Sequence, residues 1–312
     1  MNRPRSELLL SLVLALTPAL ACRAADEPSY TRVEDVIYGR KPGVALTMDV
    51  FTPKEGANGL GVIWVVSGGW FSSHEAVNPG IFASLLDRGY TVFAVVHGSQ
   101  PKYTVPEIIS DMNRSIRYIR YHAKDFKIDP ERLGISGGSA GGHLSLMQGV
   151  AGDEGDKNAK DPVDQTSSRV GAVACFFPPS DFLNYGKEGE NVIGRGILAP
   201  FRAAMDFHEF NKETHAFERI TDEDRITELG RSISPITFVS SDDPPTLIYH
   251  GDADKLVPIQ QAEIMVAKLK DAGVPAKLVV KTGAGHGWAG LPKDVETLAD
   301  WFDEHLKNKS KK

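Results

Sequence analysis

The sequence predicts an α/β fold with a mostly parallel, eight-stranded sheet covered by helices on both faces. Three observations predict it. Short, nearly continuous apolar runs recur along the chain, as expected for strands buried on both faces. Segments with apolar residues at helical spacing separate them. A glycine-rich stretch, residues 134–144, lies between one such run and a helix-compatible segment. At 312 residues, 41% of them hydrophobic, the chain can form one extensive core or two small ones.

An antiparallel pair is expected to lead the sheet. Residues 33–38 and 45–51 are joined by a turn around Lys41-Pro42-Gly43, and the second run alternates apolar and polar residues, the period of a half-buried strand. The six later strands are expected at residues 62–66, 91–96, 133–135, 172–177, 246–249 and 276–280.

Helices are expected between these strands, because strands alternating with helices are typical of a doubly covered sheet. A helix-compatible run covers residues 143–150. Helical stripes are formed by Ile109, Met112, Ile116 and Ile119, by Ile259, Ala262, Val266 and Leu269, and by Leu298, Trp301, Phe302 and Leu306.

Residues 184–232 interrupt the alternation. They contain no clear strand, but they contain mixed aromatic residues and many charges. A connection of this length inside a compact domain is usually a functional insertion with helices of its own. We therefore expect a small lid over the carboxyl edge of the sheet, the alternative being an excursion that only packs against the sheet.

Residues 1–24 are expected to be a secretory signal peptide, which leaves residues 25–312 as the mature domain. Two arginines precede an apolar stretch over residues 8–21, too short for a typical membrane span. Cleavage fits after Ala21 or after Ala24. Cys22 is either a lipid-attachment site or an unused cysteine of the discarded peptide. The protein is thus expected to be periplasmic or extracellular, with membrane attachment only if Cys22 is lipidated.

Charge and cysteine content exclude several classes of protein. The net charge is −6, no basic face favours nucleic-acid binding, and the four lysines of residues 307–312 read as a solvated end. Only Cys175 certainly remains in the mature chain, so no internal disulfide is expected. Its apolar surroundings predict a buried, inert thiol.

The glycine-rich stretch contains a G-x-S-x-G pattern from Gly137 to Gly141. Between a strand and a helix, this pattern predicts a nucleophile elbow with Ser139 at its centre. The pattern also fits one frame earlier around Ser136, but that frame would put the β-favouring Ile135 inside the turn. The alternative is a glycine-rich connection with an incidental serine.

A nucleophilic serine needs a base and an acid that orients the base, which follow it along the chain in the order acid, histidine. His286 lies in a glycine-rich loop after the last expected strand, so we predict that it is the base. The acid is expected after strand 246–249, where Asp254 is preferred to Asp252. The other downstream histidines are less well placed, namely His143, His208, His215, His250 and His305.

Backbone amides are expected to receive the oxyanion of the reaction. The residue after the nucleophile, Ala140, supplies one amide, and Gly68 and Gly69, in the loop after strand 62–66, supply the others. Alternatively, the loop that contains Gly68 and Gly69 is a plain glycine turn.

Five motifs in order resemble the α/β-hydrolase esterases related to hormone-sensitive lipase, most closely the BD-FAE-like branch. The motifs are Ser67 to Trp70, Gly137 to Leu144, Ser234 to Ile236 with Asp242 to Pro245, His250 to Pro258, and Gly285-His286. The resemblance covers residues 35–306 and implies an α/β-hydrolase fold with Ser139, Asp254 and His286 as the catalytic triad.

Two segments depart from the family pattern. The family usually carries His-Gly-Gly-Gly at the oxyanion loop, whereas this chain has Val66-Ser67-Gly68-Gly69. Relatives often have a Tyr-Arg-Leu segment where this chain has His97-Gly98-Ser99-Gln100-Pro101. The second departure puts the local packing and the acyl or alcohol pocket in question.

The resulting hypothesis is a serine esterase that acts by two-step acyl transfer and requires no metal or organic cofactor. The resemblance and the expected export favour acetyl or feruloyl esters of carbohydrates as substrates. Two alternatives stay open. One is a serine peptidase of the prolyl-oligopeptidase type, although no room for an amino-terminal propeller precedes residue 35. The other is a catalytically silent binding module.

Overall fold

The computed structural model describes residues 27–307. The predicted signal peptide, both of its cleavage sites and Cys22 lie outside the described residues. Within residues 27–307, no helix is both long enough and apolar enough to cross a membrane.

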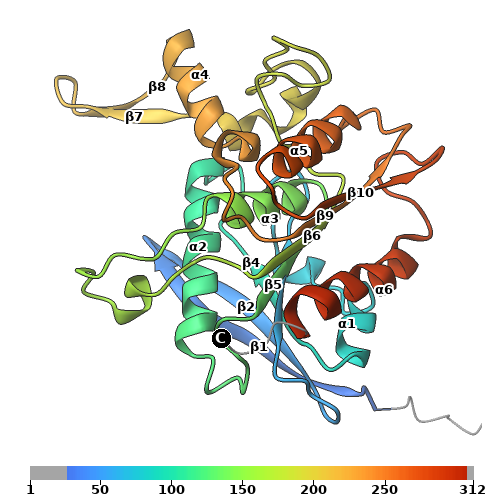
Figure 1. The fold of residues 1–312 in the computed structure, drawn as a ribbon. Coiled ribbons are helices and arrows are strands. Elements are labelled where there is room, and N and C mark those ends of the chain that lie inside the picture. The colour runs from blue at the N-terminus through green and yellow to red at the C-terminus, as the bar shows by residue number, and fades with distance from the viewer. Residues whose placement is uncertain (1–26, 308–312) are drawn as a thin grey trace, which may run out of the picture.

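Eight strands form one sheet in the order β1-β2-β4-β3-β5-β6-β9-β10 (Figure 1). β2 pairs antiparallel with β1 and with β4, and every other neighbouring pair is parallel. The prediction of a mostly parallel, eight-stranded sheet is therefore confirmed. The strands are β1 (Tyr30–Lys41), β2 (Val44–Pro53), β3 (Gly61–Val66), β4 (Thr91–Val96), β5 (Leu133–Ser136), β6 (Ala172–Phe176), β9 (Thr246–Gly251) and β10 (Ala276–Lys281).

Helices cover both faces of the sheet, because successive strand side chains point to opposite sides. In β3, Ile63 and Val65 join one buried cluster, while Val62 and Val66 join the other. The first cluster lies under α2 (Val105–Tyr121), α3 (Ala140–Val150) and α5 (Gln260–Asp271), and the second under α1 (Ala83–Asp87) and α6 (Leu291–Phe302), which continues as a π-helical turn, η5 (Asp303–Lys307). Figure 1 shows the two helical layers on either side of the sheet.

The structure tests two predictions about residues inside these layers. The buried stripe of α2 includes Val105 and Ile108, both fully buried, whereas the predicted Ile109 is only partly buried. Cys175 is buried in β6, and burial raises the pKa of its thiol well above the usual range. The Cys175 thiol is therefore inert.

The connection between β6 and β9 contains the insertion. It carries the 3₁₀ helix η3 (Gly196–Met205), a hairpin of β7 (His208–Asn211) and β8 (Ala216–Arg219), helix α4 (Glu223–Ser232) and a short 3₁₀ turn, η4 (Pro235–Phe238). The expected helices are present. The expectation that residues 184–232 hold no strand was wrong, because β7 and β8 pair antiparallel and extend away from the sheet beside α4 (Figure 1).

Candidate active site

Ser139 lies in a tight turn between β5 and α3. Its backbone has φ 55° and ψ −120°, a conformation that is strained for a residue with a side chain. A Cβ on Gly137 would lie 2.7 Å from the backbone of Gly141, and a Cβ on Gly141 would lie 2.9 Å from the carbonyl oxygen of Val65. Both glycines are therefore required by the turn. Ser136, the alternative frame, is fully buried within β5.

A hydrogen-bonded chain links the three predicted triad residues. His286 Nε2 lies 2.8 Å from Ser139 Oγ, and His286 Nδ1 lies 2.7 Å from Asp254 Oδ2. Because a carboxylate only accepts, Nδ1 carries the proton and donates it to Asp254, which leaves Nε2 to accept from the serine hydroxyl. The three residues follow β5, β9 and β10, and these parallel strands end at the same edge of the sheet.

The Asp254 carboxylate is held ionised although its side chain is fully buried. Burial acts to raise its pKa, but hydrogen bonds from His250, His286 and the Val257 amide outweigh burial and hold the pKa well below the usual range. Its Oδ1 accepts from the amides of Leu256 and Val257, at 2.9 and 3.0 Å. Oδ2 is thus left to face the imidazole of His286.

The competing acid and histidines have hydrogen-bond partners other than Ser139. Asp252 accepts from the amide of Gly283 at 2.6 Å, a turn contact between the two loops. His250 is buried; its Nε2 lies 2.8 Å from the carbonyl oxygen of Val257 and 3.5 Å from Asp254 Oδ2. His143 bridges the Trp70 indole and the carbonyl oxygen of Ile233. The remaining three lie on the hairpin or after α6, namely His208, His215 and His305.

The loop after β3 differs from the prediction at Gly68. The amide of Gly68 donates to the carbonyl oxygen of Phe71 at 2.9 Å, so this turn already uses it. The amides of Gly69 and Ala140 have no hydrogen-bond acceptor within residues 27–307. Ala140 is the first residue of α3, where backbone amides point out of the helix and attract negative charge. These two amides are therefore free to donate to a ligand.

A pocket of about 580 Å³ opens beside Ser139 and His286. Its wall is mostly apolar, and none of the described residues that line it is a carboxylate, a lysine or an arginine. The polar side chains that reach it include Ser67, Ser139 and His286, and its apolar lining includes Trp64, Val66, Phe71, Ala76, Ile81, Phe176, Phe177, Phe201, Leu256 and Leu291.

Two of these aromatic residues were not found from the sequence. Phe177 directly follows β6, has φ 38°, and its ring centroid lies 4.6 Å from that of His286. Phe201 comes from η3 in the insertion, and its ring lies 2.5 Å from where a Cβ on Gly69 would stand. The insertion therefore forms part of the pocket wall. No sequence pattern marks either residue, because both contacts join segments that are distant in the chain.

A larger hollow, about 700 Å³, lies between β1 and α2, away from the serine. Its charged side chains are largely paired with one another. Lys41 contacts Asp111 at 2.7 Å, while Arg114 contacts both Asp161 and Asp164. The hollow offers little uncompensated charge to a ligand.

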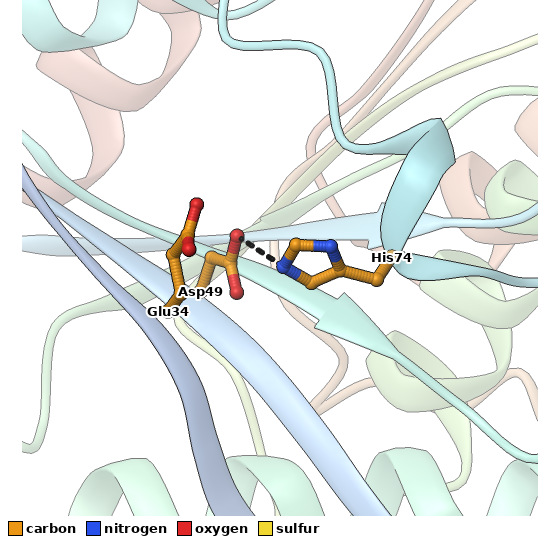
Figure 2. Close-up of side chains that lie close together, drawn as sticks. All are labelled: Glu34, Asp49 and His74. Carbon is orange, nitrogen blue, oxygen red and sulfur yellow. Dashed lines mark ion pairs between the residues drawn. The ribbon is translucent and has the colours of Figure 1, made fainter.

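Glu34, Asp49 and His74 form the one group of potential metal ligands found within residues 27–307 (Figure 2). His74 Nε2 lies 3.2 Å from Asp49 Oδ2. The same Oδ2 accepts from Arg32 Nε at 2.8 Å, and Arg32 Nη1 lies 3.1 Å from Glu34. Arg32 already pairs with both carboxylates, so the group is an ion-pair network between β1, β2 and the loop after β3.

The chain is similar to proteins that are named esterases. The BD-FAE family model matches residues 48–269. A probable carboxylic ester hydrolase of Mycobacterium tuberculosis, LipM, is 26% identical over 249 residues, 77% of this chain and 52% of LipM. The chain spans between about two fifths and three fifths of the first three curated relatives, at 52%, 62% and 41% of their lengths.

Solved structures agree with the fold. A truncated carbohydrate esterase from gut microbiota superposes with a TM-score of 0.73 at 28% identity, over 90% of this chain and 99% of that chain. An acetyl ester-xyloside bifunctional hydrolase from Caldicellulosiruptor lactoaceticus superposes with a TM-score of 0.65 at 26% identity, over 86% of this chain and 89% of that chain. The α/β-hydrolase fold predicted from the sequence is confirmed.

Proposed function

Since the chain belongs to the BD-FAE family, we propose that it hydrolyses carboxylic esters by two-step acyl transfer at Ser139. The observation that carries the proposal is the continuous hydrogen-bonded chain from Ser139 through His286 to Asp254. It ends at a serine in a strained turn beside an open, apolar pocket. Such an arrangement supplies a nucleophile, a base and an orienting carboxylate at one point.

His286 Nε2 takes the Ser139 proton as Oγ attacks the ester carbonyl. The imidazolium that forms is stabilised by Asp254, and it then protonates the departing alcohol. Water attacks the acyl-enzyme in the second step, with His286 as the base again. The amides of Gly69 and Ala140 receive the oxyanion in both steps.

The pocket favours an uncharged ester with an apolar part. Among the described residues that line it there is no basic side chain to pair with a substrate carboxylate and no acidic side chain to bind a cation. Acetyl or feruloyl esters of neutral carbohydrates fit these limits. Two similar solved structures are a carbohydrate esterase and an acetyl ester-xyloside hydrolase, which supports this substrate class.

The site of action is proposed to be outside the cytoplasm, on the strength of the apolar stretch over residues 8–21. Expression in a bacterial host followed by fractionation and mass measurement of the mature amino terminus tests this. An amino terminus at Cys22 with an added lipid mass identifies a lipoprotein, and one at Cys22 without lipid or at Ala25 identifies a soluble exported chain. Full-length protein retained in the cytoplasm would contradict export.

Hydrolysis of p-nitrophenyl acetate by the purified chain tests the activity. Ser139→Ala should abolish turnover, whereas Ser136→Ala should retain a measurable rate because Ser136 is buried within β5. An inactive unaltered chain, or a Ser139→Ala variant as active as the unaltered chain, would refute the proposed function. Acetylated and feruloylated oligosaccharides then define the natural class.

A further inference from the structure

The two departures from the family pattern touch each other. β3 and β4 are parallel neighbours with Val66 paired to Val96, so Ser67 and His97 leave the sheet side by side. His97 Nε2 lies 2.8 Å from Ser67 Oγ. A residue of the oxyanion loop is thus tied to the neighbouring loop by one hydrogen bond.

The direction of this bond follows from the second ring nitrogen. His97 Nδ1 lies 2.7 Å from the carbonyl oxygen of Gly98, which can only accept, so Nδ1 carries the proton. Nε2 then has a free lone pair and accepts from the Ser67 hydroxyl. His97 is only 3% exposed, and its burial lowers its pKa to about 4. The imidazole is neutral at pH 7, which keeps this direction fixed.

The segment after β4 holds the rest of the oxyanion loop as well. The side-chain amide of Gln100 donates to the carbonyl oxygen of Gly69, and the Gln100 backbone amide donates to that of Trp70 at 3.1 Å. The hydroxyl of Ser99 accepts from the amide of Ser72 at 2.8 Å. Both carbonyl groups are thus held from this side, while the amide of Gly69 has no acceptor within residues 27–307.

We propose that Ser67 and His97 are positioning residues, which together hold the oxyanion loop in the conformation that keeps the Gly69 amide free. Ser67 stands at the first glycine of the family's usual His-Gly-Gly-Gly run, and Val66 stands where that run has its histidine. This positioning role adds to the proposed esterase function, and its expected effect on the rate rests on that function. The hydrogen bond itself does not depend on the reaction.

Kinetics of Ser67→Ala, His97→Leu and the double variant test the pair. Ser67→Ala should lower kcat on p-nitrophenyl acetate by about tenfold to a hundredfold and change KM by less than about threefold, because oxyanion contacts form in the transition state. Ser67→Thr keeps the hydroxyl and should restore most of the rate. The double variant should be no slower than the slower single variant, since the two groups act as one unit.

Ser84→Ala is the matched control. Its hydroxyl is buried in α1 without a hydrogen-bond partner within residues 27–307, so its loss should leave kcat unchanged. Equal losses in Ser84→Ala and Ser67→Ala, or multiplicative losses in the double variant, would overturn the pairing.

Hydrogen–deuterium exchange over residues 66–72 tests the clamp without any turnover. Ser67→Ala should speed exchange of the amides of Gly68, Phe71 and Ser72, which are hydrogen-bonded in the held loop. Unchanged exchange in Ser67→Ala would overturn the positioning role, whatever the rate shows. If the unaltered chain fails to hydrolyse esters, the proposed function falls and the exchange result still decides the clamp.

Discussion

Replacing Asp254 with asparagine should inactivate the protein by reversing the His286 tautomer. The asparagine side chain has two orientations. With its oxygen toward the amides of Leu256 and Val257 it keeps both bonds, and its NH₂ group faces His286 Nδ1. The flipped orientation sets NH₂ against two backbone N–H groups. Leaving these unsatisfied costs about 1–3 kcal/mol each, or about 2–6 kcal/mol in total.

The first orientation therefore dominates, and it forces Nδ1 to accept. The proton then resides on Nε2 and points at the oxygen of Ser139, which removes the base. A wrong tautomer of this kind lowers kcat by about 10⁴, equivalent to about 5 kcal/mol of lost transition-state stabilisation. Initial rates with p-nitrophenyl acetate measure the loss, at substrate concentrations that span KM.

Asp252→Asn is the control for this change. Asp252 lies in the same loop and accepts from Gly283 rather than from the imidazole, so its amide variant should stay within about threefold of the unaltered rate. An Asp254→Asn variant that keeps more than a tenth of the activity would refute the tautomer argument. So would equal losses in the two variants.

Three further predictions concern stability and the pocket. Burial lowers the pKa of both His97 and His143 to about 4, so between pH 6.5 and pH 4 these two side chains take up protons only in the unfolded chain. The free energy of unfolding should therefore fall by on the order of 2 kcal/mol per histidine from pH 7 to pH 5. Urea titration at the two pH values measures this change. Gly141→Ala sets a methyl against the carbonyl oxygen of β3 and should reduce both thermal stability and activity, the latter at least about tenfold. Phe201→Ala should raise the butyrate-to-acetate ratio of kcat/KM several-fold, whereas Phe210→Ala on the exposed hairpin should not.

Each of these three predictions would be contradicted by a specific result. Equal unfolding free energies at pH 7 and pH 5 would show that the two histidines titrate alike in both states. A Gly141→Ala variant with full activity would mean that the turn can move away from β3. An unchanged acyl preference in Phe201→Ala would remove the insertion from the substrate pocket.

The central strands β3, β4, β5, β6 and β9 could be predicted because each is a short apolar run that is buried on both faces, and β2 could be predicted from its alternation of apolar and polar residues. The hairpin of β7 and β8 could not be predicted. β8 is exposed throughout and β7 nearly so, so neither strand needs an apolar pattern, and the turn is set by Asn211, whose side chain accepts from the amides of Glu213 and Thr214. Local side-chain contacts of this kind leave no periodic signal in the sequence.

Some features of the site could also be predicted from the sequence, and others could not. Chain order and glycine spacing were enough to select Ser139, Asp254 and His286, which the structure brings together. They could not reveal that the amide of Gly68 is already bonded, because a motif does not record which backbone groups are free. Nor could they reveal the contact of Ser67 with His97, which are 30 residues apart and meet only because β3 and β4 are neighbours.

The insertion begins after β6 and ends before β9, and these two strands pair directly with each other. Its two ends are therefore held in place by the sheet, whatever the length or shape of the chain between them. Natural variation, or a laboratory graft, can exchange Phe201 and its surroundings while the strands that carry the reacting groups keep their register. The part of the pocket wall that Phe201 forms is thus encoded separately from Ser139, Asp254 and His286, and it can change while those three residues stay in place.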